Sequence, residues 1–183
     1  MKIPVEKIIS EMIRCDAGDA KRIHHALKVY ALARAIGGEE GLPPEERDVL
    51  ETAAVLHDIG IHESERKYGS SAGYRQEQEG PPVARNLLEP FGLPPEFVDR
   101  VCYLIGHHHT YTGINGSDYQ ILVEADFLVN LYEDGAPKKE AQAVLDHVFR
   151  TETGKRYLRD MYLSAERAEP AAARRPSDEE ARA

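Results

Sequence analysis

The chain has 183 residues, of which 42% are hydrophobic, and this is enough for one domain with a sizeable core. Its formal net charge of −9 argues against DNA binding, which depends on clustered basic side chains. No stretch reaches the roughly 18 to 20 apolar residues of a membrane span, and residues 1–13 lack the apolar core of a signal peptide. The two cysteines have no metal-binding or redox spacing. We therefore expect a cytoplasmic protein that binds neither DNA nor a membrane, and a homodimer stays open.

Helical periodicity dominates the sequence, and no segment alternates apolar and polar residues as a half-buried strand does. The pattern predicts helices at 4–14, 19–36, 44–60, 81–91, 95–108, 118–133, 137–150 and 153–163. The polar connection 61–79 is predicted to be a loop, long enough to be functional. We expect an all-α fold with one helical domain over 1–163 and a polar, flexible tail over 164–183.

The predicted helix 19–36 has an apolar face that carries one histidine. The residues of this face recur at spacings of four, three and four: His25, Val29, Leu32 and Ile36. A histidine on such a face is either a hydrogen-bonded core residue or a metal ligand, and this helix alone favours the core residue. His24 points about 100° away from His25 and is predicted to be peripheral.

The predicted helix 44–60 ends in His57 and Asp58, an adjacent pair that follows an apolar run. His57 shares a face with Ala54, so it belongs to the buried stripe. Two polar side chains at the buried end of a helix can both face one ion. A local hydrogen-bonded pair is the alternative. Gly60 is predicted to stop this helix.

Three consecutive histidines end the predicted helix 95–108 and precede a glycine-rich loop. These residues are His107, His108 and His109. A histidine run is either a solvated surface or part of a pocket wall. Its position after an apolar helix favours the pocket wall.

The strongest indication comes from the predicted helix 118–133, which is apolar on nearly every face and should be buried. Asp126 falls at its centre. A buried, ionised carboxylate is very costly unless it is paired or binds a metal. A carboxylate that accepts hydrogen bonds from a neighbouring helix explains this helix alone equally well.

Taken together, the three helices favour one shared metal site over a separate hydrogen-bonding explanation for the polar residues of each helix. Several independent unsatisfied polar groups in one core would otherwise be required, and such groups are rare. Two histidines with two aspartates form a mixed nitrogen and oxygen set, which suits Fe, Mn, Zn, Co or Ni rather than a thiolate site. The candidate metal ligands are His25, His57, Asp58 and Asp126.

The motifs that surround these residues read Arg22-Ile-His-His25, Ala54-Val-Leu-His57-Asp58-Ile-Gly60 and Val123-Glu-Ala-Asp126. In this order, and embedded in helices, they resemble the HD superfamily of metal-dependent phosphohydrolases. The resemblance covers about residues 19–133. It implies an HD-domain-like helical bundle around a divalent transition metal ion held by the four candidate ligands.

The chain departs from the family pattern at two positions. Ile61 stands where many relatives carry a phosphate-binding lysine, or a glutamate in relatives that cleave nucleotide phosphates. Gln76 stands where two-metal relatives have a histidine, whereas their later histidine matches His108. Glu77 or Glu79 are alternative ligands near Gln76. The resemblance therefore implies one tightly held ion per chain.

The resemblance also implies hydrolysis of a small phosphate ester or a nucleotide by a metal-activated water. The catalytic candidates are Asp58, which would orient that water, and His108 and Glu77, which are candidates by location. His107 is a further candidate for the general acid. The candidates for substrate binding are Lys28, Arg66, Lys67, Arg75, His107 and Tyr111, for each of which a solvated surface position is the alternative.

Two other classes of protein stay open. A non-catalytic binding module would keep a metal or a nucleotide without turnover, and the absence of lysine and glutamate at Ile61 favours it. An oxidative di-iron relative would need the second-metal ligand that Gln76 does not supply. The hydrolase remains the preferred interpretation.

Overall fold

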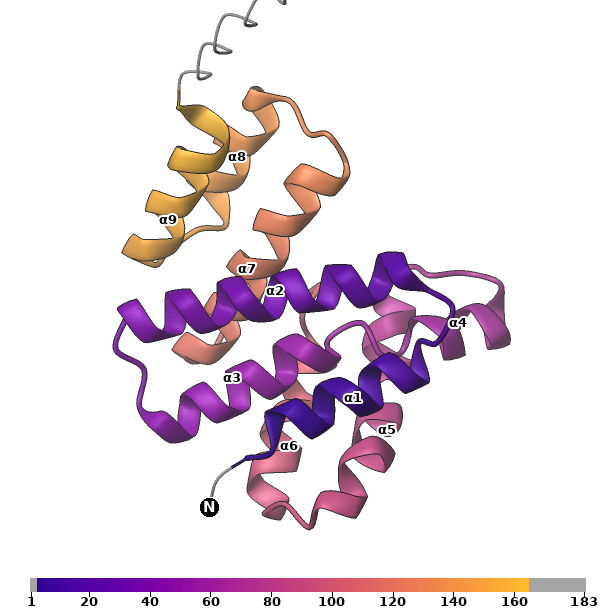
Figure 1. The fold of residues 1–183 in the computed structure, drawn as a ribbon. Helices are drawn as coiled ribbons and strands as arrows, with labels where there is room; N and C mark the ends of the chain where they lie inside the picture. The colour runs from indigo at the N-terminus through magenta and orange to yellow at the C-terminus, as the bar shows by residue number, and fades with distance from the viewer. Residues whose placement is uncertain (1–2, 165–183) are drawn as a thin grey trace, which may run out of the picture.

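The computed structural model describes residues 3–164, and this part of the chain contains helices and no strand (Figure 1). The helices are α1 (Val5–Cys15), α2 (Ala20–Glu39), α3 (Pro44–Leu56), α4 (Ile61–Tyr68), α5 (Gly73–Leu88), α6 (Pro95–Ile105), α7 (Ser117–Glu133), α8 (Lys138–His147) and α9 (Glu152–Leu158), with short helical turns at Glu89–Phe91 and Arg159–Leu163. The predicted all-α fold is confirmed. Among the described residues, no helix is both long and apolar enough to span a membrane. The predicted tail, apart from Ser164, lies outside the described residues.

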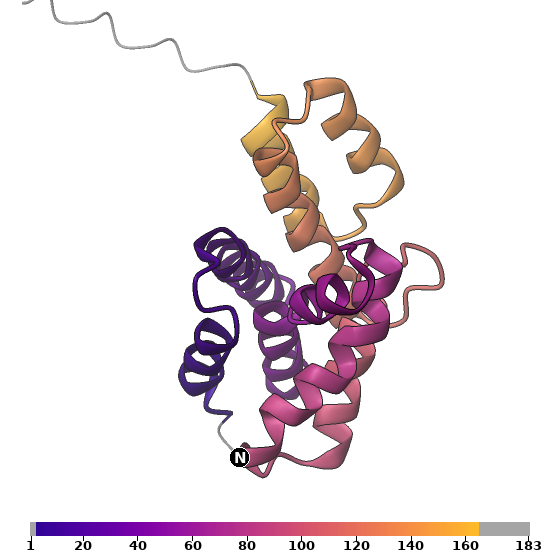
Figure 2. The same ribbon diagram turned by 90° about the vertical axis from the view of Figure 1, so that its right-hand side faces the viewer.

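The helices form two groups that share α7. α2 packs against both α3 and α7, while α5 pairs with α6 beneath them (Figure 1). α9 lies against the middle of α7 and α8 packs against α9, on the far side of α2 from α5 and α6 (Figures 1 and 2). α7 is almost entirely buried, as the sequence predicts, because apolar side chains cover nearly all of its faces.

α2 is the long helix that carries the first motif. Its start is capped by Asp19, whose side chain accepts a hydrogen bond from the backbone N–H of Arg22 at 3.1 Å. The helix continues past its predicted end, because Gly37 does not stop it. A Cβ on Gly37 would lie 3.0 Å from the side chain of Leu50, so this glycine allows α2 and α3 to approach closely.

The prediction of a loop over 61–79 is wrong. α4 and the first part of α5 occupy this segment. α4 buries only two of its residues, so it has no apolar stripe that periodicity could detect. Tertiary pairing holds it instead, because both Lys67 and Tyr68 bond to Glu79 of α5.

The predicted helix 44–60 ends earlier than expected. α3 stops at Leu56, and the His-Asp pair lies in the turn that leads to α4. Gly60 precedes α4 rather than ending α3, and a Cβ on it would lie 2.5 Å from the backbone nitrogen of Gly80 in α5. Only a glycine permits this approach, which presses the turn against α5. α6 likewise ends at Ile105, so the three histidines also lie in a turn.

Candidate metal centre

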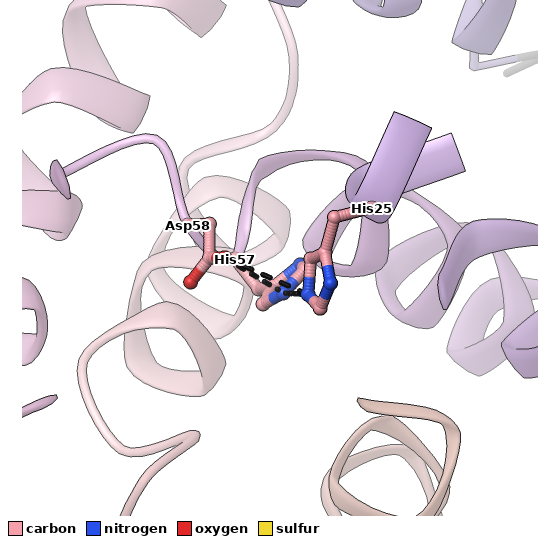
Figure 3. A group of neighbouring side chains, drawn as sticks. All are labelled: His25, His57 and Asp58. Carbon is pink, nitrogen blue, oxygen red and sulfur yellow. Dashed lines mark hydrogen bonds and ion pairs between the residues drawn. The ribbon is translucent and has the colours of Figure 1, made fainter. Parts of the chain in front are cut away.

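Side chains from α2, α7 and the turn after α3 meet at one point in the core. His25 Nε2 lies 3.1 Å from His57 Nε2 and 3.1 Å from Asp126 Oδ1. Asp58 Oδ2 is 3.6 Å from each of these two imidazole Nε2 atoms. Figure 3 shows the His25 side chain, from α2, beside those of His57 and Asp58, which are adjacent in the turn after α3. The structure thus brings together all four residues that the sequence predicts as ligands.

Neutral imidazoles in this cluster present lone pairs, not protons, to one another. His57 Nδ1 lies 2.9 Å from the carbonyl of Ala54, and His108 Nδ1 lies 2.8 Å from the carbonyl of Ile105. A carbonyl only accepts, so each Nδ1 carries the proton and each Nε2 of a neutral ring carries a lone pair. His108 Nε2 is buried, 3.4 Å from Asp58 Oδ1, and has no hydrogen-bond partner within residues 3–164.

A cation between these atoms resolves their mutual repulsion. Imidazole lone pairs and carboxylate oxygens are ligands that divalent transition metals accept. Within the described residues, His25, His57 and Asp58 each offer one donor atom, and these atoms lie within 4.8 Å of one another. The set therefore fits a divalent metal ion, with Asp126 beside it.

The acid–base properties of the metal-free chain also fit cation binding. Burial lowers the pKa of the His57 imidazole, but Asp58 and Asp126 outweigh burial and raise this pKa to about 9. Burial raises the pKa of each carboxyl, and the neighbouring imidazoles outweigh it, so both pKa values lie well below the usual range. The carboxylates thus attract positive charge, which a proton or a metal ion can supply.

A second group of donors shares Asp58 with the first. Asp58, His108 and His109 also offer atoms within 4.8 Å of one another. Gln76 donates its amide N–H to the carbonyl of Ser71 at 2.7 Å, so its oxygen faces His109 Nε2 at 3.2 Å. His109 Nε2 is therefore the donor, and its Nδ1 keeps a lone pair. Burial and the nearby His108 lower the pKa of His109 to about 4, so this ring is neutral.

The remaining catalytic candidate, Glu77, supports the turn that carries the histidines. Its Oε1 accepts hydrogen bonds from the backbone N–H of His109 and from the hydroxyl of Thr110, both at 3.0 Å. His107 turns to the opposite side, where its Nδ1 donates to the carbonyl of Tyr103 at 2.7 Å and its ring stacks on that tyrosine. The structure thus places His108 and His109, but not His107, beside Asp58.

The basic substrate-binding candidates are engaged in pairs. The Arg75 guanidinium lies 4.1 Å from the ring centroid of Tyr68, at the contact between α4 and α5. Arg66 and Lys67 pair with Glu63 of α4.

Tyr111 and Lys28 lie on the side of the cluster formed by α7. Tyr111 is half exposed, with its ring centroid 5.0 Å from that of Phe127. Burial, and then the charge of Asp126, raise the pKa of its hydroxyl to about 12. Lys28 pairs with Glu133 at the end of α7. Substrate binding by Tyr111 and Lys28 stays a prediction.

Sequence reasoning did not predict the roles of two residues of this centre. His109 belongs to the histidine run that was predicted to form a pocket wall, but it was not named as a candidate ligand. Glu133, which lies 3.1 Å from His25 Nδ1, gave no signal, because a glutamate at a helix end is commonly exposed. Only the packing of α7 against α2 reveals its partner.

A helical bundle with a buried cluster of histidines and aspartates defines a class of metal-binding proteins. The model of the HD domain matches residues 22–165, so this chain belongs to the HD domain family, which comprises metal-dependent phosphohydrolases. The resemblance stated from the motifs is confirmed. Family membership and the cluster both support a divalent metal ion.

A solved structure has the same fold. The crystal structure of a predicted HD superfamily hydrolase from an uncultured Thermotogales bacterium matches with a TM-score of 0.61 and 24% sequence identity. The match covers 85% of this chain and 83% of that one. No curated protein sequence matches this chain.

Proposed function

We propose that this protein hydrolyses a small phosphate ester or a nucleotide with a divalent transition metal ion. The observation that carries the proposal is the convergence of imidazole Nε2 atoms on two carboxylates, the partly exposed Asp58 and the buried Asp126. Membership of the HD family supports the same chemistry. His25, His57, Asp58 and Asp126 would hold the ion, which when bound polarises a phosphate oxygen and lowers the pKa of a water.

Access to the cluster supports a catalytic role for Asp58. Its side chain is 19% exposed, whereas those of His57 and Asp126 are 0% and 4% exposed. Water and a phosphate group would therefore enter on the side of Asp58. There its carboxylate orients the attacking water, and His108 Nε2, 3.4 Å from Asp58 Oδ1, takes up a proton.

We further propose one tightly held ion per chain. The first group has four protein donors, while the second adds only His108 and His109 to the shared Asp58. A structural or calorimetric study that finds two ions bound with equal affinity would contradict this. His108 would then be a ligand and would no longer accept the proton.

The test begins with protein purified without a chelating tag, whose metal content is measured by mass spectrometry. Nucleotides and sugar phosphates are then screened for phosphate release with added Mn, Co or Ni. We expect metal-dependent release from at least one compound, and we expect Asp58→Ala to abolish it. Asp134→Ala, which removes an exposed carboxylate next to α7, is the matched control and should retain activity.

A binding module is the second candidate, and Ile61 favours it because a phosphate-binding lysine is missing there. If the protein is a binding module, it would retain the metal and would hydrolyse no compound. A nucleotide that binds tightly and is recovered intact from the metal-loaded protein would replace our proposal with this one.

A further inference from the structure

One helix contacts both nitrogens of the His25 imidazole. Asp126 Oδ1 lies 3.1 Å from Nε2, and Glu133 Oε2 lies 3.1 Å from Nδ1. The two carboxylates are seven residues apart on α7, which is about two helical turns, so they lie on the same face. The ring, which comes from α2, is therefore held between them.

The position of His25 within a helix explains why a carboxylate is needed at Nδ1. His57 and His108 follow the ends of α3 and α6, where backbone carbonyls lack helical partners and can accept from Nδ1. His25 lies inside α2, where the carbonyls of the preceding turn already accept helical hydrogen bonds. An acceptor for its Nδ1–H must come from another element, and Glu133 supplies it.

We propose that Glu133 is a positioning residue that fixes the tautomer and the orientation of His25 for metal binding. An ionised carboxylate has no proton to give, so the proton on this side belongs to Nδ1 and the Nε2 lone pair faces the metal site. A carboxylate behind a ligating imidazole also makes the ring a stronger donor. This inference rests on the proposed metal site and adds the residue that tunes it.

Lys28 takes a different role in this arrangement from the one that its sequence suggests. Its ammonium pairs with Glu133 Oε1, one turn of α2 beyond His25. The Glu133 side chain is 14% exposed and that of Lys28 is 44% exposed, so the ion pair joins a nearly buried carboxylate to a lysine at the surface. Lys28 therefore helps to hold Glu133 against His25.

The experiment measures the affinity of the full chain for Zn²⁺ or Co²⁺ by competition with a chelator. We expect Glu133→Ala to weaken binding by about 10- to 100-fold, the usual loss for such a partner. Glu133→Gln keeps an oxygen that can accept from Nδ1–H, so it should lose less than Glu133→Ala. Lys28→Met should also lose less, because Glu133 remains. Asp134→Asn removes the neighbouring charge and should bind as the wild type does.

A second readout separates positioning from a plain ion pair between α2 and α7. Nitrogen NMR of the metal-free protein, under conditions where the His25 ring is neutral, should show the proton at Nδ1 in the wild type and in Lys28→Met, but a mixture of both tautomers in Glu133→Ala; an unchanged tautomer in Glu133→Ala would overturn the proposal. Wild-type affinity in Glu133→Ala would overturn the proposal. If that variant does not fold, Glu133→Met takes its place, because it keeps the length of the side chain but offers no acceptor to Nδ1–H, and unchanged affinity there would overturn the proposal. A wild type that takes up no metal would instead refute the proposed function.

Discussion

Glu124 and Asp126 lie two residues apart on α7 and are both buried, with exposures of 0% and 3%, yet their surroundings differ completely. Glu124 accepts hydrogen bonds from the backbone N–H groups of Arg150 at 2.6 Å and Thr151 at 2.9 Å. It also accepts from the amide of Gln120 at 2.8 Å and from the hydroxyl of Thr151. Asp126 faces the imidazole nitrogens of the metal cluster instead.

The two carboxylates differ in whether their hydrogen-bond partners carry fixed protons or lone pairs. Glu124 meets donors whose protons are bound permanently, so its charge is satisfied and it joins α7 to the start of α9. Asp126 meets nitrogens that carry a lone pair in the neutral ring, so it is satisfied only when a proton or a cation is added. A buried carboxylate therefore indicates a metal site only when its neighbours lack fixed protons.

The largest expected effect is that of Asp126→Ala. This variant should lose metal binding, and with it the stability that the ion confers, which is about 4 kcal/mol at a metal concentration of a thousand times Kd. Denaturant unfolding with and without metal measures both quantities. Full metal occupancy in the variant would contradict the ligand assignment.

Glu124→Ala should lower the stability of the fold but leave metal binding intact. It leaves several buried donors at the start of α9 without an acceptor, which costs about 3 kcal/mol in the free energy of unfolding. The folded fraction should still bind one ion. Denaturant unfolding gives the first value and metal analysis of the purified folded protein gives the second. Loss of metal without loss of stability would contradict the structural role assigned to Glu124.

A smaller effect is expected at His25, which shares the metal with three other ligands. His25→Ala removes a proposed ligand rather than its partner, so it should lose metal, with a loss of affinity larger than the roughly 100-fold upper value for an outer partner, or more than about 2.8 kcal/mol. His24→Ala is the matched control, because His24 is exposed on the same helix, and its affinity should be unchanged. The reverse behaviour in a chelator competition assay would show that the wrong face of α2 had been assigned.

The smallest effect on the tight ion is expected at His109. It belongs only to the second group of donors, so His109→Ala should leave the affinity of the first ion within a few-fold of wild type. Calorimetric titration with Zn²⁺ measures this affinity. A loss as large as that in His25→Ala would make the two groups a single site.

The amino-acid sequence by itself determined the all-helical fold and the residues that form the cluster. α7 was predictable because apolar residues on every face require burial, which leaves Asp126 in need of partners. α4 was not predictable, because it buries little and its contacts with Glu79 of α5 are absent from its own periodicity. Burial of apolar area is encoded locally, whereas a polar helix depends on partners distant in the sequence.

Only the tertiary structure decided how the donors of the site are oriented. The residue types at positions 25, 57, 58 and 126 predict metal ligands but not which ring nitrogen would face the ion. That choice depends on the group behind each ring, which is a helix-end carbonyl for His57 and His108 and Glu133 for His25. Glu133 is 108 residues from His25 along the chain. Hydrogen-bond geometry acts over about 3 Å, so no spacing in the sequence reveals a pair that meets only when α2 packs on α7.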